Sequence, residues 1–214
     1  RPKQLVRFRD QYLLDHALKV AGSIDFVTKI LILGANYYTI TKQIQKHSFA
    51  VVQNEHWQEG MASSIRKGVE GSLKNCPKLE QIMILVGDQP LVNRQHLQNL
   101  IDSQLQNNSE ASFSEYEGNL GVPAIFSERM FPELLKLKGD HGAKKLLFKS
   151  NLEYSTVKLE GGHFDVDTEA DVERLKAMEQ DEVKIHEAFS LVCKDVKKGK
   201  LIIREVLEIT GIKN

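Results

Sequence analysis

Short apolar runs alternate with amphipathic segments along the first half of the chain. Apolar runs at 30–33, 49–52 and 82–86 predict buried strands. The spacing of apolar residues at 7–21 and 35–46 predicts helices before and between them. Because parallel strands need connections long enough to hold a helix, this alternation predicts an α/β fold in which a mostly parallel sheet is flanked by helices.

The second half of the chain continues the pattern. Because the predicted helix at 93–104 is polar, His96 on it is expected to be solvated. Beyond Gln180 the sequence becomes charged and amphipathic, which predicts one domain over residues 1–179 and a helical extension over 180–214. The remaining predicted elements are strands at 111–116, 122–126 and 154–159, and helices at 139–147, at 169–178 and from Ser127 onward.

The strand predicted at 82–86 breaks at Gly87 and is followed by Asp88. In open α/β sheets, ligands bind in the crevice beyond the carboxyl ends of the strands, so Asp88 is the first candidate for chemistry. The alternative is that Asp88 begins a turn or caps the next helix, since Asp is common in both places. The local sequence leaves both interpretations open.

Two glycine turns open predicted helices and form candidate ligand loops. The run Gly60-Met61-Ala62-Ser63-Ser64 places small residues and free backbone N–H groups at a helix N-terminus, where an anion or a flat ring could approach closely. In the alternative, the two serines cap the helix and Trp57 is a packed aromatic. The second turn, at 139–147, carries two lysines early in its helix, a placement that is more favourable beside an anion.

Two further segments supply polar or rigid groups. Pro123 cannot donate to a sheet ladder, which favours a strand end or edge and makes Gly121-Val122-Pro123 a candidate substrate-lining segment. In Phe164-Asp165-Val166-Asp167-Thr168, alternation with a period of two puts both carboxylates on one face, and Thr168 is predicted to cap the next helix. A cap and a solvated carboxylate, without chemistry, remain the alternative for the two acids.

Composition narrows the class of protein. Lys plus Arg and Asp plus Glu each total 29, so no net charge attracts nucleic acid or an anionic membrane. With 214 residues and 41% hydrophobic residues, the chain can bury one sizeable core. Cys76 and Cys193 lack metal-ligand spacing, which argues against a zinc site and for a reducing cytosol. Since no stretch approaches the ~20 apolar residues of a membrane span, we expect a cytoplasmic protein whose partners include neither nucleic acid nor membrane.

Six motifs occur in order over residues 1 to about 179, and each is weak alone. They are Pro2-Lys3-Gln4-Leu5, Trp57 with Gly60 to Ser64, Gly87-Asp88-Gln89-Pro90-Leu91, Gly121-Val122-Pro123-Ala124, Gly139-Asp140-x-Gly142-Ala143 and Phe164 to Thr168. Together they resemble the molybdenum cofactor nucleotidyltransferases, and most closely the branch that transfers CMP from CTP to molybdopterin.

The resemblance implies a Rossmann-like fold of the nucleotide-diphospho-sugar transferase type, with Mg²⁺ as cofactor and CTP as substrate. The terminal phosphate of the molybdopterin acceptor would attack the α-phosphate of CTP, and pyrophosphate would leave. Such a transfer needs charge neutralisation and in-line positioning rather than covalent help. The alternatives are a guanylyltransferase or sugar-phosphate nucleotidyltransferase of the same fold, or a catalytically silent nucleotide- or cofactor-binding partner of a molybdoenzyme.

The resemblance also assigns roles position by position. Lys3 matches the triphosphate-binding lysine, Asp88 the metal-binding aspartate and Asp167 the second acidic position. If Mg²⁺ joins them, the carboxylates of Asp88 and Asp167 should lie within roughly 8 Å of each other, with Asp165 as the fallback. The other implied contacts are Gly60, Ser63 and Ser64 on the nucleotide side, and Gly121, Val122, Pro123, Gly142 and Lys144 on the acceptor side.

The start of the chain departs from the family pattern. Family members precede Pro-Lys-Gln-Leu with a hydrophobic strand and a glycine-rich loop that wraps the triphosphate and contributes to base choice. This chain opens at Arg1 without a methionine, so we expect further residues upstream. A molybdoenzyme or its maturation factor is the expected protein partner.

Overall fold

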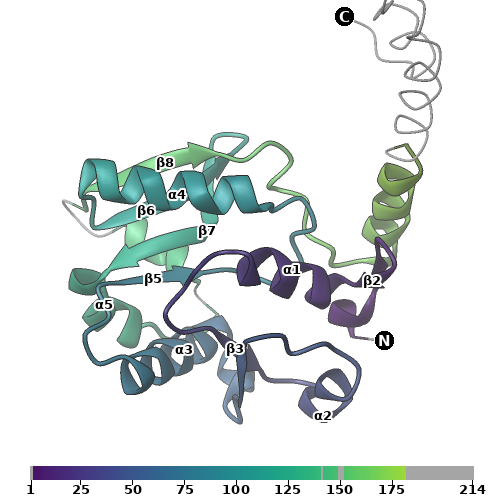
Figure 1. Ribbon diagram of the computed structural model, residues 1–214, viewed down its shortest axis with the longest axis horizontal. Helices are drawn as coiled ribbons and strands as arrows, with labels where there is room; N and C mark the ends of the chain where they lie inside the picture. Colours follow the sequence, from purple (N-terminus) through teal and green to yellow (C-terminus); the bar gives the residue numbers. More distant parts are fainter. Residues whose placement is uncertain (1, 141, 149–151, 182–214) are drawn as a thin grey trace, which may run out of the picture. The chain divides into compact units, whose positions relative to one another are not determined.

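The computed structural model describes residues 2–140, 142–148 and 152–181 (Figure 1). The chain divides into two compact units between Val166 and Asp167, and each is described by itself. The described part of the second unit is a helix at 169–181 with the residues that lead into it.

The first unit alternates strands and helices in the predicted way. Its helices are α1 (Leu13–Gly22), α2 (Tyr37–Thr41), α3 (Met61–Asn75), α4 (Arg94–Asn107) and α5 (Phe131–Leu135), with 3₁₀ helices η1 (Lys3–Leu5), η2 (Trp57–Glu59), η3 (Glu128–Met130) and η4 (Ala143–Phe148). Its strands are β1 (Arg7–Phe8), β2 (Gln11–Tyr12), β3 (Ile30–Leu33), β4 (Ala50–Gln53), β5 (Gln81–Ile84), β6 (Ala111–Tyr116), β7 (Asn119–Ser127) and β8 (Tyr154–Lys158).

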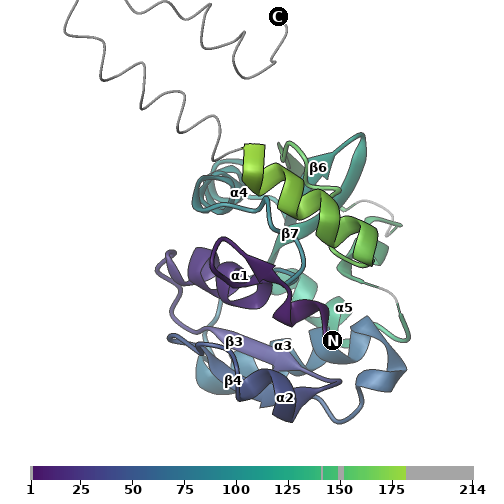
Figure 2. The same ribbon diagram turned by 90° about the vertical axis from the view of Figure 1, so that its right-hand side faces the viewer.

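Hydrogen bonding sorts the strands into separate ladders. β1 and β2 form a hairpin, and β3 lies beside β4 in parallel (Figure 2). A four-stranded sheet has the order β5-β7-β6-β8. Because β7 is antiparallel to both β5 and β6, and β6 is parallel to β8, three of its four strands share one direction. The predicted α/β fold, with a mostly parallel sheet flanked by helices, is confirmed, and β7 is its reversed strand.

Three local predictions are wrong. The helix predicted at 7–21 begins only at Leu13, because the residues before Leu13 form the β1–β2 hairpin. The turn of this hairpin has positive φ at Arg9 and Asp10. The helix predicted at 35–46 is limited to α2. His96 is buried rather than solvated, since it shares one face of α4 with Leu100 and Gln104 at a spacing of four residues.

Two aromatic rings anchor the largest core cluster. Phe113 of β6 and Phe126 of β7 are fully buried and meet edge to face with centroids 5.5 Å apart. Residues of α3, α5 and η4 complete this cluster. A second cluster joins Leu97 of α4 to Leu159, and Figure 1 shows α4 alongside β6 and β8. The sheet therefore has helices packed against it, and its strand ends are left to form a site.

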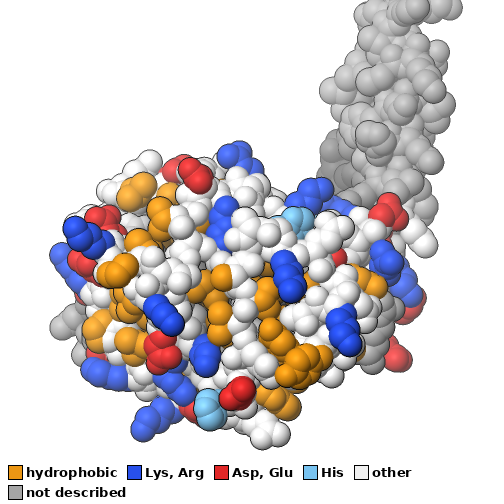
Figure 3. Space-filling view, turned by 60° about the horizontal axis from the view of Figure 1, so that its bottom comes forward, with side chains coloured by type: hydrophobic (Ala, Val, Ile, Leu, Met, Phe, Trp, Pro, Cys, Tyr) orange, Lys and Arg blue, Asp and Glu red, His pale blue; other side chains and the backbone are white. Residues whose placement is uncertain are grey.

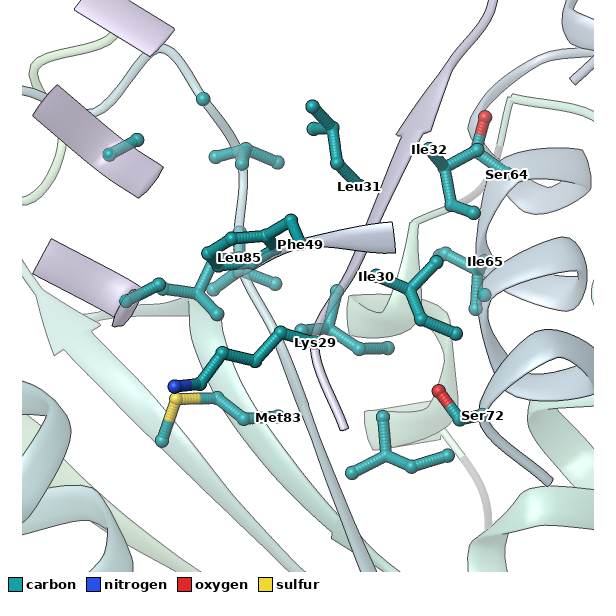
Figure 4. A pocket seen from close by; sticks show the side chains of 18 of the residues that line it. Lys29, Ile30, Leu31, Ile32, Phe49, Ser64, Ile65, Ser72, Met83 and Leu85 are labelled. Atoms are coloured by element: carbon teal, nitrogen blue, oxygen red, sulfur yellow. The ribbon is translucent and has the colours of Figure 1, made fainter. Parts of the chain in front are cut away.

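β3 and β5 are edge strands among the described residues, and a cavity of about 440 Å³ lies between them (Figure 4). Consecutive residues of both segments line it, from Thr28 to Leu33 and from Gln81 to Asp88. Since successive side chains of a strand point to opposite faces, this lining shows that the cavity meets the strand edges. Its α3 wall includes the small residues Ser64, Gly68 and Ser72.

The surface carries both signs of charge. On the face shown in Figure 3, Lys and Arg side chains are interspersed with Asp and Glu side chains. Within the described ranges, no helix combines the length and the apolar character that crossing a bilayer requires.

Candidate active site

Lys3 and Asp88 meet beyond the carboxyl end of β5, although 85 positions separate them in the sequence. Lys3 Nζ lies 2.6 Å from Asp88 Oδ2. The Asp88 side chain is 18% exposed, and its Oδ1 is buried without a hydrogen-bond partner. The structure thus places a cation against the predicted metal-binding acid, and one oxygen of that acid keeps its capacity to accept a donor or a metal.

The turn that carries Asp88 is held from two sides. His16 Nε2 of α1 lies 3.1 Å from the carbonyl of Pro90. Gln89 Nε2 donates to the carbonyl of Gly162 at 3.3 Å. A Cβ on Gly87 would lie 2.9 Å from a leucine of α1, so glycine permits the close approach of turn and helix. These contacts preorganise the turn, which is what a site that positions charge requires.

The segment with the later aspartates reaches the same turn. The backbone N–H of Val166 donates to the carbonyl of Asp88 at 3.1 Å, which brings Asp165 next to the turn. The extended alternation predicted over 164–168 forms no strand in the structure, because this N–H bonds to the turn instead of to a sheet ladder. Asp167 belongs to the second unit, so its convergence with Asp88 stays a prediction.

Thr168 caps the helix that follows, as predicted. Asp171 N–H donates to Thr168 Oγ1 at 3.2 Å, and the Thr168 hydroxyl donates to Asp171 Oδ2 at 2.7 Å. The Thr168 side chain is the main cause of a lowered Asp171 pKa. This reciprocal pair satisfies backbone donors at the helix start.

The N-terminus of α3 is closed by the chain itself. Met61 N–H donates to Asp140 Oδ1 at 3.3 Å, and Ala62 N–H donates to the Gly139 carbonyl at 3.1 Å. Gly60 has a φ of +112°, and a Cβ there would lie 2.6 Å from the backbone of Gly139. The expectation of free N–H groups is therefore wrong at these two positions, because a carboxylate and a carbonyl from the next glycine turn occupy them.

Asn54 organises the predicted serine pair, and the sequence reasoning did not single it out. It is 1% exposed, and its Nδ2 donates to Ser63 Oγ at 2.8 Å and to Ser64 Oγ at 3.0 Å. Ser63 is buried and donates to the Gly60 carbonyl, whereas Ser64 lines the cavity. The available signal was position, since Asn54 follows β4 as Asp88 follows β5.

Gly121–Pro123 form a bulge in the middle of the four-stranded sheet. Phe113 pairs with Ala124 and the next residue, Ser114, pairs with Gly121, so two residues of β7 have no partner on β6. Pro123 was predicted at a strand end or edge, but β7 lies between β5 and β6. The bulge explains why the sheet tolerates a residue without an N–H there.

Tyr116 connects this bulge to the Asp88 turn. A Cβ on Gly121 would collide with the Tyr116 hydroxyl, so the strand requires glycine at this point. Burial raises the pKa of Tyr116, the charge of Asp165 raises it further, and a hydrogen bond with Gln89 opposes both. The phenol is accordingly neutral and available for hydrogen bonding at physiological pH.

The turn after Gly139 packs against the start of α3. A Cβ on Gly142 would lie 3.0 Å from the Met61 sulfur. Lys144 is exposed on η4. The α-helix predicted at 139–147 is instead this 3₁₀ helix, so the dipole argument for an anion beside its lysines does not hold. The acceptor roles of Gly142 and Lys144 stay predictions.

One cavity is lined by residues from the predicted nucleotide side, the predicted metal-binding position and the predicted acceptor side. Ser64 from the nucleotide loop, Asp88 and Val122 from the bulge all line it. The unpaired Oδ1 of Asp88 fits Mg²⁺, a hard cation that takes one or two carboxylates and completes its shell with waters and substrate phosphates. Among the residues with described positions, no group of three or more His, Cys, Asp or Glu could hold a metal. A metal at Asp88 would therefore share phosphate oxygens as ligands.

Comparison with known proteins identifies the family. The family model for the MobA-like NTP transferase domain matches residues 1–154. The chain belongs to the MobA-like NTP transferase family. The purine catabolism protein PucB of Bacillus subtilis is 30% identical over 162 residues, which cover 72% of this chain and 72% of PucB. Other curated relatives of this MobA-like chain are longer bifunctional proteins, of whose length it spans 27%.

Solved structures agree with the MobA-like assignment. Rv0371c of Mycobacterium tuberculosis, crystallised in complex with manganese, is 30% identical with a TM-score of 0.68, over 82% of this chain and 91% of that one. The molybdopterin-guanine dinucleotide biosynthesis protein A of Archaeoglobus fulgidus is 14% identical with a TM-score of 0.60, over 82% and 89% of the chains. The second likeness shows the shared nucleotidyltransferase fold alone.

Proposed function

We propose that this MobA-like transferase transfers CMP from CTP to the terminal phosphate of a molybdopterin-type acceptor and releases pyrophosphate. The observation that carries the proposal is the contact between Lys3 Nζ and Asp88 Oδ2 at 2.6 Å beyond β5. Phosphoryl transfer needs at least a cation that binds the phosphates and an acid that can hold a metal. Lys3 can act as the point charge, and Asp88 has an oxygen without a hydrogen-bond partner.

The residues of the chain supply charge and position. Lys3 is 37% exposed at its side chain, so its ammonium can exchange Asp88 for a phosphate oxygen of an incoming nucleotide. Asp88 is thereby released to hold Mg²⁺, which when bound neutralises charge on the phosphates. The manganese in the Rv0371c crystals supports a divalent cation in this role. No side chain has to form a covalent intermediate, because positioning and electrostatics carry this class of reaction.

Base choice rests on the residues around α3 and the turn after Asp88. Gln89 follows Asp88 as in the cytidylyl branch, which supports CTP over GTP. The Archaeoglobus fulgidus neighbour, whose name specifies a guanine dinucleotide, makes GTP the alternative within the fold.

The test is pyrophosphate release by the protein expressed from its complete reading frame. CTP, GTP and ATP are each offered with molybdopterin, with a sugar 1-phosphate and with no acceptor. We expect release with CTP and molybdopterin, and rapid turnover only with GTP would transfer the assignment to the guanylyl branch. Asp88→Asn and Lys3→Met should each lower kcat by about 10²- to 10³-fold, the cost of removing one preorganised charge contact.

A matched surface pair provides the control. Lys136 Nζ lies 3.2 Å from Glu133 Oε1 on α5, away from the cavity lining. Lys136→Met should leave the rate unchanged, since exposed ion pairs contribute little. Nucleotide binding without transfer to any acceptor would favour the catalytically silent partner instead.

We further propose that a strand preceding Arg1 fills the part of the cavity that runs along β3 and β5, and leaves the end at Ser64, Asp88 and Val122 open to substrates. α1 lines this cavity with Leu14 and Leu18 and leads directly into β3, as the crossover helix of a β-α-β unit does. A strand placed there would be buried on both faces and would join the two ladders into one sheet.

Hydrogen exchange tests the strand. The amides of β3 and β5 should exchange more slowly in the complete polypeptide than in one that starts at Arg1. Equal exchange, or a reading frame that encodes no apolar segment upstream, would contradict it.

A further inference from the structure

Ser114 and His96 form a buried polar pair beside the β7 bulge. Ser114 of β6 is fully buried and His96 of α4 is 4% exposed. His96 Nε2 lies 2.7 Å from Ser114 Oγ, and the hydroxyl donates to the Pro123 carbonyl at 2.6 Å. Because a carbonyl can only accept, the imidazole donates from Nε2 to the hydroxyl oxygen in this arrangement. Two hydrogen bonds therefore run in series from the helix to the bulge.

The bulge depends on a partner outside the ladder. Val122 and Pro123 have no opposite residues on β6, so the Pro123 carbonyl is left to find another donor, and the Ser114 hydroxyl is that donor. Bulges beside binding sites re-aim a side chain. Here Val122 lines the cavity that Asp88 also lines, while Pro123 is buried.

We propose that Ser114 and His96 are positioning residues for the phosphate acceptor. By fixing the Pro123 carbonyl, they hold Val122 at the wall of the cavity and Gly121 next to it in the strand. This rests on the proposed function, in which Gly121–Pro123 line the acceptor side. Both side chains act through the bulge, since neither is accessible to a substrate.

Ser112 shows what a purely structural serine looks like on the same strand. It is also fully buried, and its hydroxyl donates to Gln104 Oε1 at 2.6 Å and contacts the Ser155 hydroxyl at 2.5 Å. These contacts join β6 to α4 and β8 and do not reach β7. Ser112→Ala is therefore a matched control for Ser114→Ala, with the same change in the same strand.

The kinetic test separates acceptor binding from nucleotide binding. Ser114→Ala should raise KM for the molybdopterin acceptor about 10- to 100-fold, as expected for a wall displaced by up to about 1 Å, and should leave KM for CTP unchanged. His96→Leu should do the same, and His96→Gln, whose Nε2 can still donate, should recover most of the loss. Ser112→Ala should change neither KM.

Hydrogen exchange tests the pair independently of the reaction. Amides of residues 120–125 should exchange faster in Ser114→Ala than in the wild type, and should keep wild-type rates in Ser112→Ala. If the wild type transfers no nucleotide, the proposed function fails, and this exchange pattern still decides whether the pair holds the bulge. Equal effects of the two serine variants, on exchange or on KM, would overturn the positioning role. So would an unchanged acceptor KM in Ser114→Ala.

Discussion

The buried imidazole of His96 makes folding stability depend on pH. Burial lowers the pKa of His96 from 6.5 to about 4, and a hydrogen bond with the backbone of Lys158, which stabilises the protonated ring, opposes this shift. In the unfolded chain the same group titrates near pH 6.5. Between these values the unfolded state binds one proton more than the folded state, so stability falls as the pH falls through this window. The stabilisation that depends on the neutral ring is complete well above pH 6.5. By pH 4 about 3 kcal/mol of unfolding free energy is lost.

The variant His96→Gln isolates this contribution, since it removes the titration and keeps a donor near the position of Nε2. We expect the wild type to lose about 3 kcal/mol of unfolding free energy relative to the variant between pH 7 and pH 4. Urea unfolding at half-unit pH intervals measures it. A difference that stays constant with pH would refute the reasoning.

Glycine substitutions test the close contacts of the site. Gly60 and Gly118 both have positive φ, but only at Gly60 would a Cβ meet backbone, 2.6 Å from Gly139. Gly118→Ala should therefore cost about 1 kcal/mol of unfolding free energy and Gly60→Ala at least about 2, and equal losses in urea unfolding would contradict this. Gly121→Ala should destabilise by about 1–3 kcal/mol through collision with Tyr116, and adding Tyr116→Phe should recover part of it in the same assay. No recovery would show that the hydroxyl is not the obstacle.

Local patterns were sufficient for most of the strands and for the position of Asp88 after one of them. The apolar run before Gly87 predicted a strand with Asp88 beyond its end, and the structure has β5 with Asp88 in the turn that follows. Thr168 was recognised as a cap because capping depends on neighbours in sequence. The order of the six motifs was sufficient for the family, which the family model over residues 1–154 confirms.

Contacts between distant segments could not be predicted in this way. Asp140 closes the start of α3 from 79 positions away, so the N–H groups that look free in the sequence are occupied. The bulge at Pro123 depends on the register between β6 and β7, which a single strand does not encode. The prediction for His96 was wrong because α4 is polar as a whole, whereas His96 lies on its buried face, four residues before Leu100.

The central proposal is a metal and a nucleotide at Asp88, and anomalous scattering locates the metal directly while the electron density locates the nucleotide. Crystals of the complete protein are grown with Mn²⁺ and a non-hydrolysable CTP analogue, and the manganese peak is mapped. We predict a peak within about 2.5 Å of an Asp88 carboxylate oxygen, with phosphate oxygens as further ligands and Lys3 Nζ moved from Asp88 to a phosphate. A manganese peak away from Asp88, with Lys3 still 2.6 Å from its carboxylate, would contradict the account.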